Sequence, residues 1–448
     1  MYRGSRRNCL KTLLSLGVCA GARAAWPSKL AAKMSASGHQ RRLIVLWMPG
    51  GPSQMDTFDL KPGHDNGGPF KEIQTTVPGM KFSEHLPKLA QLADHLSIVR
   101  SMQTKEGDHS RGTFLIRTGQ RPGVPLRYPA LPAALAKELS HDNPSVPGYV
   151  SILPNSFISP AAFGAGFLGT AREPLTVAGT ATFDPTQPNQ TQPTDQSSPV
   201  ELRVDNLLPP PDLQREQLEQ RKRFWEILQD SYGAPRRPGP AATHDTVYRR
   251  AMQLAESSLV DAFDLQQESD DTRRKYGLDA FGQGCLMARR LIERDVPVVE
   301  VSLSDGPGGL SWDSHADNFA TVKSLSERLD RSWSQLMIDL RDSGLLEKTT
   351  IVWMGEFGRT PKINENTGRD HFPNAWTCVL GGAGIQGGSI VGATSVGGQE
   401  VTDRPVSAPD FLATICRAVG VAPDTENLSE DRRPVKITEG TPITEILA

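Results

Sequence analysis

Short apolar runs separated by amphipathic stretches dominate the chain from residue 41 onward. Six runs rich in Val, Ile and Leu are typical of strands that are buried on both faces of a sheet: RRLIVLWM, LSIVRSM, VPGYVSIL, VPVVEVSLS, TTIVWM and WTCVLGG. Between most of them, polar and apolar positions alternate with a helical period over residues 86–95, 112–118, 131–140, 318–343 and 408–419. This alternation predicts an α/β fold with a mainly parallel central sheet and helices on both faces.

The middle of the chain breaks this pattern. Residues 176–205 include DPTQPNQTQPTDQSSP, whose Pro, Gln and Thr content predicts a flexible loop because it offers little apolar surface to bury. Residues 211–294 contain three amphipathic helical stretches, which we interpret as a helical insertion or cap. The expected organisation is therefore a single α/β domain over residues 41–448 that carries this loop and this insertion.

The N-terminus has the three parts of a twin-arginine export signal, which we assign to residues 1–25. They are SRRNCLK, an apolar run over residues 13–22 and the small-residue site Ala22-Arg23-Ala24. Cys9 departs from this pattern, in which Phe is usual. The apolar run is much shorter than the roughly 20 residues of a spanning helix, so no stable membrane span is expected. We expect the twin-arginine machinery to export the chain, already folded, to the periplasm or the extracellular space.

Charge and cysteine content give no support for nucleic-acid binding, a disulfide framework or a cysteine metal motif. The 49 basic and 51 acidic residues nearly balance, which gives no electrostatic reason to expect nucleic-acid binding. Three cysteines follow the signal, Cys285, Cys378 and Cys416, and their wide spacing forms neither a disulfide framework nor a CxxC metal motif. We interpret them as small core residues.

Polar side chains gather where the predicted strands end, which is where parallel sheets bind ligands. One pair follows VPVVEVSLS, another follows TTIVWM, and a third precedes WTCVLGG: Asp313 and His315, Glu356 and Arg359, and Asp370 and His371. Carboxylate oxygens and imidazole nitrogens together suit a divalent metal, namely zinc, manganese, iron or calcium. Each pair alone is more often structural or part of a solvated loop, but three pairs at strand ends favour a metal site.

A fourth cluster, Asp108, His109, Ser110 and Arg111, stands at the start of a predicted helix. Free backbone N–H groups at a helix start favour an anion, and Arg111 could hold phosphate or sulfate with two hydrogen bonds. The alternative is that Asp108 or Ser110 only caps the helix.

The stretch WDSHADNF places Asp313 and His315 two residues apart. In extended chain their side chains would point to opposite sides, so the loop must bend at Ser314 if both are to bind one ion. Asp317 and Asn318 are expected to cap the long helix that follows.

Several segments together resemble the alkaline phosphatase and sulfatase superfamily, and more narrowly its exported bacterial branch known as domain of unknown function 1501. They are MPGGPSQMDTFDLKPG, DHSRGTFLIRTG, GEFGRTP, GRDHFPNAWTCVLGGAGI and APDFLATICRAVGV. The resemblance extends over nearly the whole chain from Arg42. It implies an alkaline-phosphatase-like fold, a nucleophile at a helix start, and Asp, His and Glu ligands for one or two divalent metals that support the cleavage of phosphate or sulfate esters.

By this resemblance, Asp313 and His315 match a ligand pair, His371 matches a late ligand, and Glu356 stands where an Asp is usual. The carboxylate expected after the first strand is missing, because LWMPGG places Pro49 and Gly50 there. Asp56 or Asp59 could replace it only if the loop folds back.

The nucleophile position also departs from the family, since His109 occupies it and Ser110 follows. A histidine there could accept a phosphoryl group or bind the metal. Arg111 and Arg359 would neutralise the oxygens of the transferred group.

The function that the resemblance implies is an exported, metal-dependent hydrolase of phosphate or sulfate esters acting on an anionic ester or glycan. The alternative is a non-catalytic binding protein that keeps the fold and holds an anionic glycan or a partner protein. The missing carboxylate favours the binding protein, and the polar residues retained at three strand ends favour the enzyme.

Overall fold

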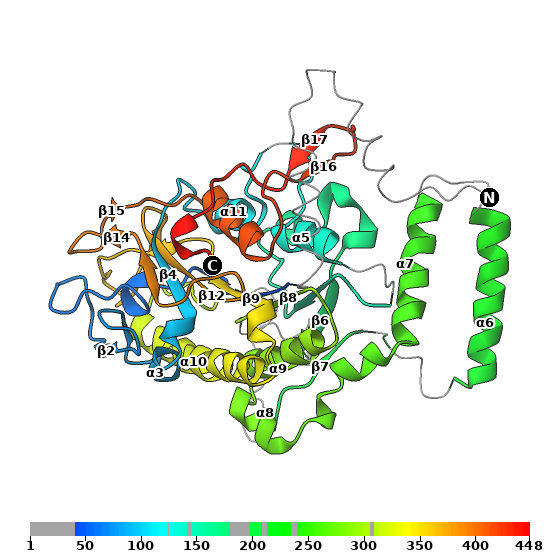
Figure 1. Ribbon diagram of the computed structural model, residues 1–448, viewed down its shortest axis with the longest axis horizontal. Coiled ribbons are helices and arrows are strands. Elements are labelled where there is room, and N and C mark those ends of the chain that lie inside the picture. The colour runs from blue at the N-terminus through cyan, green and yellow to red at the C-terminus, as the bar shows by residue number, and fades with distance from the viewer. Residues whose placement is uncertain are drawn as a thin grey trace, which may run out of the picture. The chain divides into compact units, whose positions relative to one another are not determined.

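The computed structural model describes residues 41–123, 125–140, 145–179, 198–205, 207, 213–233, 240–304 and 309–448 (Figure 1). The predicted export signal at residues 1–25 lies outside these residues.

A nine-stranded sheet forms the centre of the described part of the chain (Figure 1). β12 and β7 are antiparallel to their neighbours, and the other strands share one direction. Across the sheet the order is β13 (Ser389–Val391), β4 (Leu96–Met102), β12 (Trp376–Gly382), β9 (Thr349–Met354), β1 (Arg42–Trp47), β8 (Val298–Ser302), β5 (Tyr149–Ile152), β6 (Leu175–Gly179) and β7 (Leu202–Arg203).

Alternate residues of β1 enter two separate hydrophobic cores. Ile44 and Leu46 pack on one side of the sheet, and Leu43, Val45 and Trp47 pack on the other. Because both faces of the strand are buried, its sequence is a continuous apolar run rather than an alternating one. This arrangement confirms the predicted α/β class with a mainly parallel sheet.

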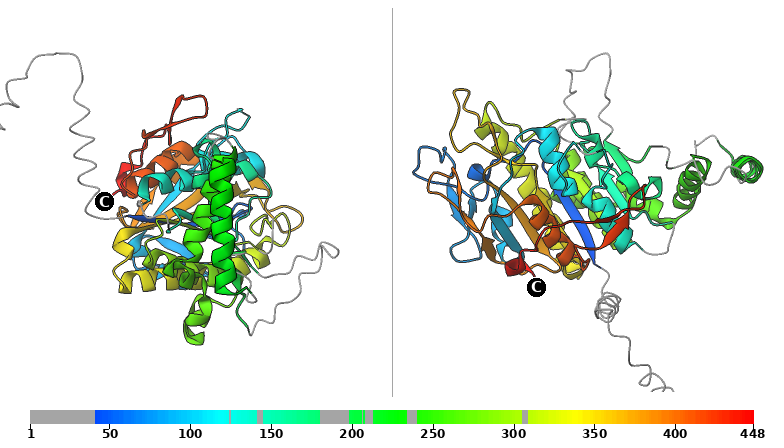
Figure 2. Two further views of the ribbon diagram at one scale, coloured as in Figure 1. Left: turned by 90° about the vertical axis from the view of Figure 1, so that its right-hand side faces the viewer. Right: turned by 90° about the horizontal axis from the view of Figure 1, so that it is seen from above.

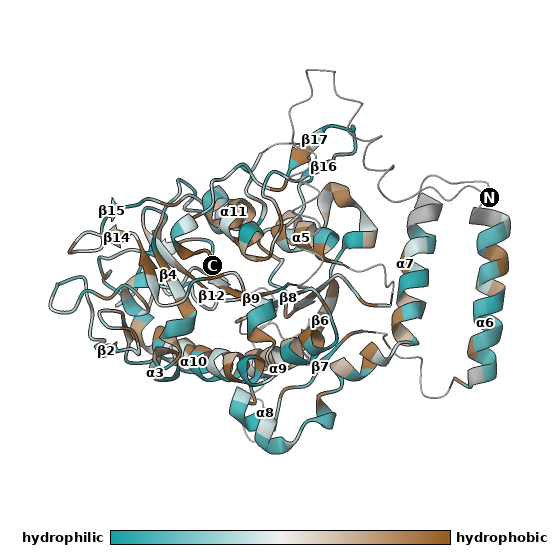
Figure 3. Cartoon of the chain, viewed as in Figure 1, coloured by the Kyte–Doolittle hydropathy of each residue, from teal (hydrophilic) through white to brown (hydrophobic). Residues whose placement is uncertain are grey.

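Helices cover both faces of the sheet, as Figures 1 and 2 show. One layer contains α9 (Ala280–Glu293) and α10 (Asn318–Asp342), and the opposite layer contains α4 (His109–Thr118), α5 (Leu131–Leu139) and α11 (Ala408–Ala418). In α10 the buried apolar residues recur every three or four positions, for example Leu325, Leu329, Trp333 and Leu336. Figure 3 shows the resulting mixture of hydrophobic and hydrophilic residues along these helices.

Within the described residues, the α-helices of the predicted insertion at 211–294 are α6 (Arg215–Leu228), α7 (Pro240–Ala255), α8 (Asp270–Tyr276) and α9. α6 and α7 contact each other through the stacked rings of Trp225 and Tyr248. α9 packs directly on β8 and α10. Of the predicted loop at 176–205, the first residues end β6, β7 lies near its other end, and residues 180–197 lie outside the described residues.

Two predicted helix starts differ from the structure. α4 begins at His109, three residues before the helical pattern at 112, because the side chain of Asp108 accepts a hydrogen bond from the backbone N–H of Arg111. The prediction that Asp317 and Asn318 cap α10 is wrong. Asp317 adopts a left-handed conformation with φ 47° and makes no side-chain cap hydrogen bond, and the Asn318 amide instead donates to Asp56.

The described chain also contains smaller elements. One short helix, α3 (Pro87–Ala90), precedes β4, and four two-stranded sheets are formed by β2 (Glu72–Gln74) with β3 (Lys81–Ser83), β10 (Gly358–Arg359) with β11 (His371–Phe372), β14 (Ala393–Thr394) with β15 (Val401–Asp403), and β16 (Glu426–Leu428) with β17 (Pro434–Lys436). Cys285, Cys378 and Cys416 are buried and unpaired, as predicted. Among the helices that the structure describes, none is both long and apolar enough to cross a membrane.

Candidate metal centre

The directions of five strands bring distant segments to one edge of the sheet. β1, β4, β8 and β9 share a direction, so their carboxyl ends lie at the same edge. β12 runs the opposite way, so the segment that precedes it begins at that edge too. The chain therefore delivers Gly50 after β1, the Asp313 loop after β8, Glu356 after β9, and His371 before β12.

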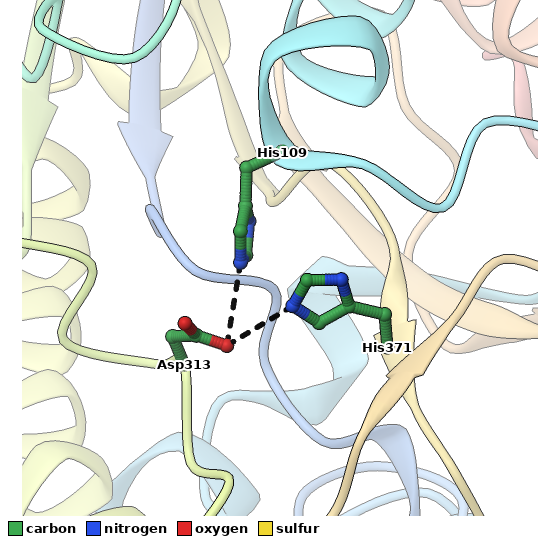
Figure 4. A group of neighbouring side chains, drawn as sticks. All are labelled: His109, Asp313 and His371. Carbon is green, nitrogen blue, oxygen red and sulfur yellow. Dashed lines mark hydrogen bonds and ion pairs between the residues drawn. The ribbon is translucent and has the colours of Figure 1, made fainter.

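Asp313 lies at the centre of a group of three histidines. Its Oδ1 atom is 3.3 Å from the Nε2 atoms of His109 and His371 and 3.1 Å from that of His315. Figure 4 shows the rings of His109 and His371 converging on the Asp313 carboxylate from two different segments. One potential ligand atom each from His109, Asp313 and His371 lies within 4.8 Å of the other two.

The second ring nitrogen of each histidine is held by an oxygen atom. His109 Nδ1 is 2.6 Å from Glu356 Oε1, His315 Nδ1 is 2.8 Å from Asp370 Oδ1, and His371 Nδ1 is 2.8 Å from the carbonyl of Gly107. Histidines that bind metals usually donate this other N–H to a carboxylate or a carbonyl, which orients the ring. All three Nε2 atoms are consequently directed toward Asp313.

The helix that carries His109 is fitted closely against the loop after β9. Gly112 allows this approach, because a Cβ at that position would lie 2.9 Å from the ring of Phe357. The His109 ring contacts the same phenylalanine at a centroid distance of 5.0 Å. Only 11% of the His109 side chain is exposed, so its position is fixed by packing as well as by hydrogen bonds.

The Asp313 loop bends at Ser314, as the spacing of the two ligand candidates required. The backbone N–H of His315 donates to the carbonyl of Asp313 across this residue, at 3.1 Å. The Ser314 hydroxyl is buried and donates to the Asn318 side chain at 2.6 Å, which ties the bend to the first turn of α10. The prediction of a bend is therefore confirmed.

The charges of the cluster are strongly coupled. Burial raises the pKa of Asp313, but the nearby imidazoles of His109 and His371 and the guanidinium of Arg359 outweigh burial and hold that pKa well below its usual range. Burial lowers the pKa of His109, and the neighbouring carboxylates of Asp313 and Glu356 overcome this and raise it to about 9. His109 is thus a cation at neutral pH in the metal-free protein.

The donor set fits a divalent cation. His109 Nε2 is buried and makes no hydrogen bond, although Asp313 is near, so an unused donor atom is directed into the cluster. Ligands of a tetrahedral zinc ion bound at about 2.0–2.1 Å lie roughly 3.3 Å apart, close to the separations around Asp313 Oδ1. The carboxylates of Asp313, Glu356 and Asp370 face one arginine, Arg359, which leaves two negative charges once the histidines are neutral.

Two predicted residues, Glu356 and Arg359, lie beside the converging ligand atoms. Glu356 is fully buried and contacts His109, and it is not part of the group of converging ligand atoms among the described residues. Arg359 is also fully buried, with Nη2 2.5 Å from Asp313 Oδ1. Its remaining N–H groups donate to the carbonyls of Gly50, Gly51 and Arg369, so Arg359 braces the loop after β1.

Three other predicted residues lie outside the cluster. Asp56 is fully buried in a two-point salt bridge to Arg369, at 2.7 and 3.1 Å, and the β1 loop does not fold back to bring it to the histidines. Arg111 is exposed and paired with Glu106 at 2.6 Å. Ser110 is exposed in the first turn of α4, and no described hydrogen bond joins it to the cluster.

Sequence reasoning named Glu356 and Asp370 as ligand candidates, and among the supports of the three imidazole rings it missed Gly107. Gly107 contributes only a backbone carbonyl, which no pattern of side chains can show. The contact between His109 and Glu356 joins residues 247 positions apart and depends on the order of strands in the sheet. The helpful signal was the placement of His109 at a helix start, one residue after a capping aspartate.

Comparison with known proteins places the chain in a family. A profile of the family described as "Protein of unknown function (DUF1501)" matches residues 40–447. The chain belongs to this family. No curated protein matches it significantly.

Solved structures that resemble this DUF1501 protein include three enzymes. A sulfatase from Pseudoalteromonas sp. is 11% identical with a TM-score of 0.39, and the match covers 88% of this chain and 70% of that one. A phosphonate monoester hydrolase from Silicibacter pomeroyi is 14% identical with a TM-score of 0.35, covering 90% and 76%. The lipoteichoic acid synthase from Listeria monocytogenes is 9% identical with a TM-score of 0.37, covering 86% and 73%. Similarity at this level does not assign an activity to this DUF1501 protein.

Proposed function

We propose that this DUF1501 protein is an exported, metal-dependent hydrolase of phosphate or sulfate esters. The observation that carries the proposal is the convergence of three imidazole Nε2 atoms on Asp313 while each Nδ1 is held by an oxygen. Salt bridges between histidine and aspartate do not require this second set of contacts, whereas metal-binding histidines commonly have it.

In this proposal His109, Asp313 and His371 hold a divalent cation, and His315 supplies a further nitrogen from the solvent side. His315 is the most open of the three histidines, with 46% of its side chain exposed. A divalent cation bound there would supply a Lewis acid that polarises an ester oxygen and makes water more acidic.

The residues around the cluster would prepare the site for an anionic ester. Arg359 and the three ring supports keep the ligands in place before substrate arrives, so that little rearrangement accompanies binding. The exposed side of the cluster, formed by His315 and Asp370, is where an ester would reach it. Burial of His109 and Glu356 on the opposite side keeps water away from the back of the site.

A second candidate function is a binding protein that keeps the fold without turnover. Two features favour it: β1 is followed by Pro49 and Gly50 instead of a carboxylate, and α4 begins with His109 where the superfamily has its nucleophile. Such a protein would use the same metal site to hold an anionic glycan or a partner protein.

The test is metal analysis of the protein purified after native export, together with a panel of aryl phosphate and aryl sulfate esters. The hydrolase predicts about one equivalent of a divalent metal and turnover of at least one ester class, with both lost in His371→Ala. Bound metal without turnover of either class would favour the binding protein. Absence of bound metal would contradict both functions.

A further inference from the structure

Glu356 occupies a fixed position behind His109. Its Oε1 atom accepts two hydrogen bonds, from His109 Nδ1 at 2.6 Å and from the backbone N–H of Gly50 at 2.8 Å. The side chain is fully buried. With both hydrogen bonds on it, Oε1 has little freedom to swing toward the cluster and replace a ligand there, while the buried Oε2 makes no described hydrogen bond.

The contact determines which nitrogen of His109 is available. A carboxylate can only accept a hydrogen bond from Nδ1, so the proton of a singly protonated ring is held at Nδ1 and the lone pair remains on Nε2. That Nε2 atom is the buried one without a hydrogen bond, 3.3 Å from Asp313 Oδ1. A neighbouring carboxylate also makes an imidazole a stronger metal ligand.

The backbone at Gly50 excludes a carboxylate side chain from this position after β1. Its φ of 105° lies in the region that favours glycine, and a Cβ there would be only 2.4 Å from the backbone nitrogen of Asp313. No residue with a side chain fits this position while the Asp313 loop stays where it is. Gly50 contributes its backbone N–H, which donates a hydrogen bond to Glu356 Oε1.

We propose, on the basis of the metal site in the proposed function, that Glu356 is a positioning residue that orients His109 for a divalent cation and is not itself a ligand. Gly50 holds Glu356 in place for this role. The carboxylate that is missing after β1 is thus replaced by a connection from the backbone of Gly50 through Glu356 to the ring of His109.

The experiment measures Co²⁺ binding to metal-stripped protein, by calorimetry for the affinity and by the visible absorption of bound Co²⁺ for the ligand set. Glu356→Gln keeps the shape and an accepting oxygen, and Glu356→Ala removes the support. Asp56→Asn is the matched control, because Asp56 is an equally buried carboxylate that is paired with an arginine and contacts no histidine of the cluster.

Loss of such supports typically lowers metal affinity roughly 10- to 100-fold, so we expect about a 10-fold loss for Glu356→Gln and about a 100-fold loss for Glu356→Ala. The Co²⁺ absorption bands of Glu356→Gln should stay at the wild-type positions. Asp56→Asn should lower the thermal stability and leave the affinity unchanged. Wild-type affinity in Glu356→Ala, or bands displaced as by the loss of a ligand in Glu356→Gln, would overturn the proposal.

A measurement on the wild-type protein tests the proposal even if the variants do not fold. In the ¹⁵N spectrum of the zinc-loaded protein, His109 should carry its proton on Nδ1 and the metal on Nε2, and the opposite assignment would overturn the proposal. Metal binding without ester turnover would remove the hydrolase and leave this role of Glu356 intact. The hydrolase function and the positioning role of Glu356 can therefore be contradicted independently of each other.

Discussion

At the scale of single residues, the site depends on which ring nitrogen of each histidine is held by an oxygen and which one faces Asp313. The sequence was sufficient to predict that Asp313, His315 and His371 lie close together, because polar residues at strand ends meet at one edge of a parallel sheet. It could not separate ligands from their supports. Glu356 and His109 have the right chemistry for either role, and only the packing of α4 against the loop after β9 decides which atom faces which.

His315→Ala should lower the affinity for a divalent metal by at least about 10-fold, because it removes a nitrogen located 3.1 Å from both Asp313 Oδ1 and His371 Nε2. Titration of the metal-stripped protein with Zn²⁺ measures this. Lys362→Ala is a suitable control, since Lys362 is an exposed residue outside the cluster. Equal affinities for wild type and His315→Ala would remove His315 from the ligand set.

Metal affinity should rise with pH in the neutral range. Binding requires His109 to lose the proton that its raised pKa, about 9, retains in the metal-free protein. While one proton is displaced, the apparent affinity increases about tenfold for each pH unit, and the increase should level off as the pH passes this pKa. Calorimetric titrations at several pH values provide the check, and a flat profile up to pH 9 would mean that His109 does not bind the metal.

The stability of the metal-free protein should depend on pH in the opposite direction and fall as the pH rises. Because the pKa of His109 is raised from 6.5, its ion pairs stabilise the folded protein fully below pH 6.5, and this contribution is lost as the pH rises through about 9. The midpoint of thermal unfolding of the metal-free protein should fall over that interval. His109→Gln should flatten the dependence, and an unchanged slope in this variant would assign the effect to another group.

At the scale of elements, strands were easier to predict than helix ends. The strands of the sheet centre are buried on both faces, so their apolar runs mark them directly, as in TTIVWM for β9. Helix starts depend on one side chain and one backbone angle. Asp108 and Asp317 precede α4 and α10 in the same way in sequence, yet only Asp108 adopts the extended backbone that lets its carboxylate reach the helix.

This difference predicts unequal effects of two similar substitutions. Asp108→Ala should lower the free energy of unfolding by about 0.5–2 kcal/mol, because it removes a helix cap. Asp317→Ala should change it by less than about 0.5 kcal/mol, because the Asp317 side chain makes no cap hydrogen bond. Urea unfolding of both variants measures the difference, and a larger loss for Asp317→Ala would contradict the assignment of the caps.

At the scale of the whole molecule, the alternation of strands and helices was sufficient for the fold class but not for the order of strands. β1 lies between β8 and β9, which follow it by about 250 to 300 residues, and no local pattern encodes such pairings. The antiparallel direction of β12 could not be predicted from the sequence pattern either. This direction places His371 at the edge of the sheet where the carboxyl ends of β1, β8 and β9 lie. Fold and site are therefore coupled through the topology of the sheet.

Because the proposed ligands come from segments after β4 and β8 and before β12, a bound metal should stabilise the whole described domain. At a free metal concentration of about 100 times the Kd, linkage predicts a gain of about 2.7 kcal/mol. Thermal unfolding with and without added Zn²⁺ should show the gain in wild type and not in the double variant His109→Ala/His371→Ala. The same shift in both proteins would place the stabilising metal elsewhere.

The most direct test of the metal centre is a crystal structure of the metal-loaded protein with anomalous diffraction measured at the absorption edge of the metal. We expect one strong anomalous peak within about 2.0–2.2 Å of the Nε2 atoms of His109 and His371 and of a carboxylate oxygen of Asp313. Glu356 should remain hydrogen-bonded to His109 Nδ1, as it is without metal. A fully loaded protein with no peak between these residues, or with its peak at another part of the chain, would contradict the account.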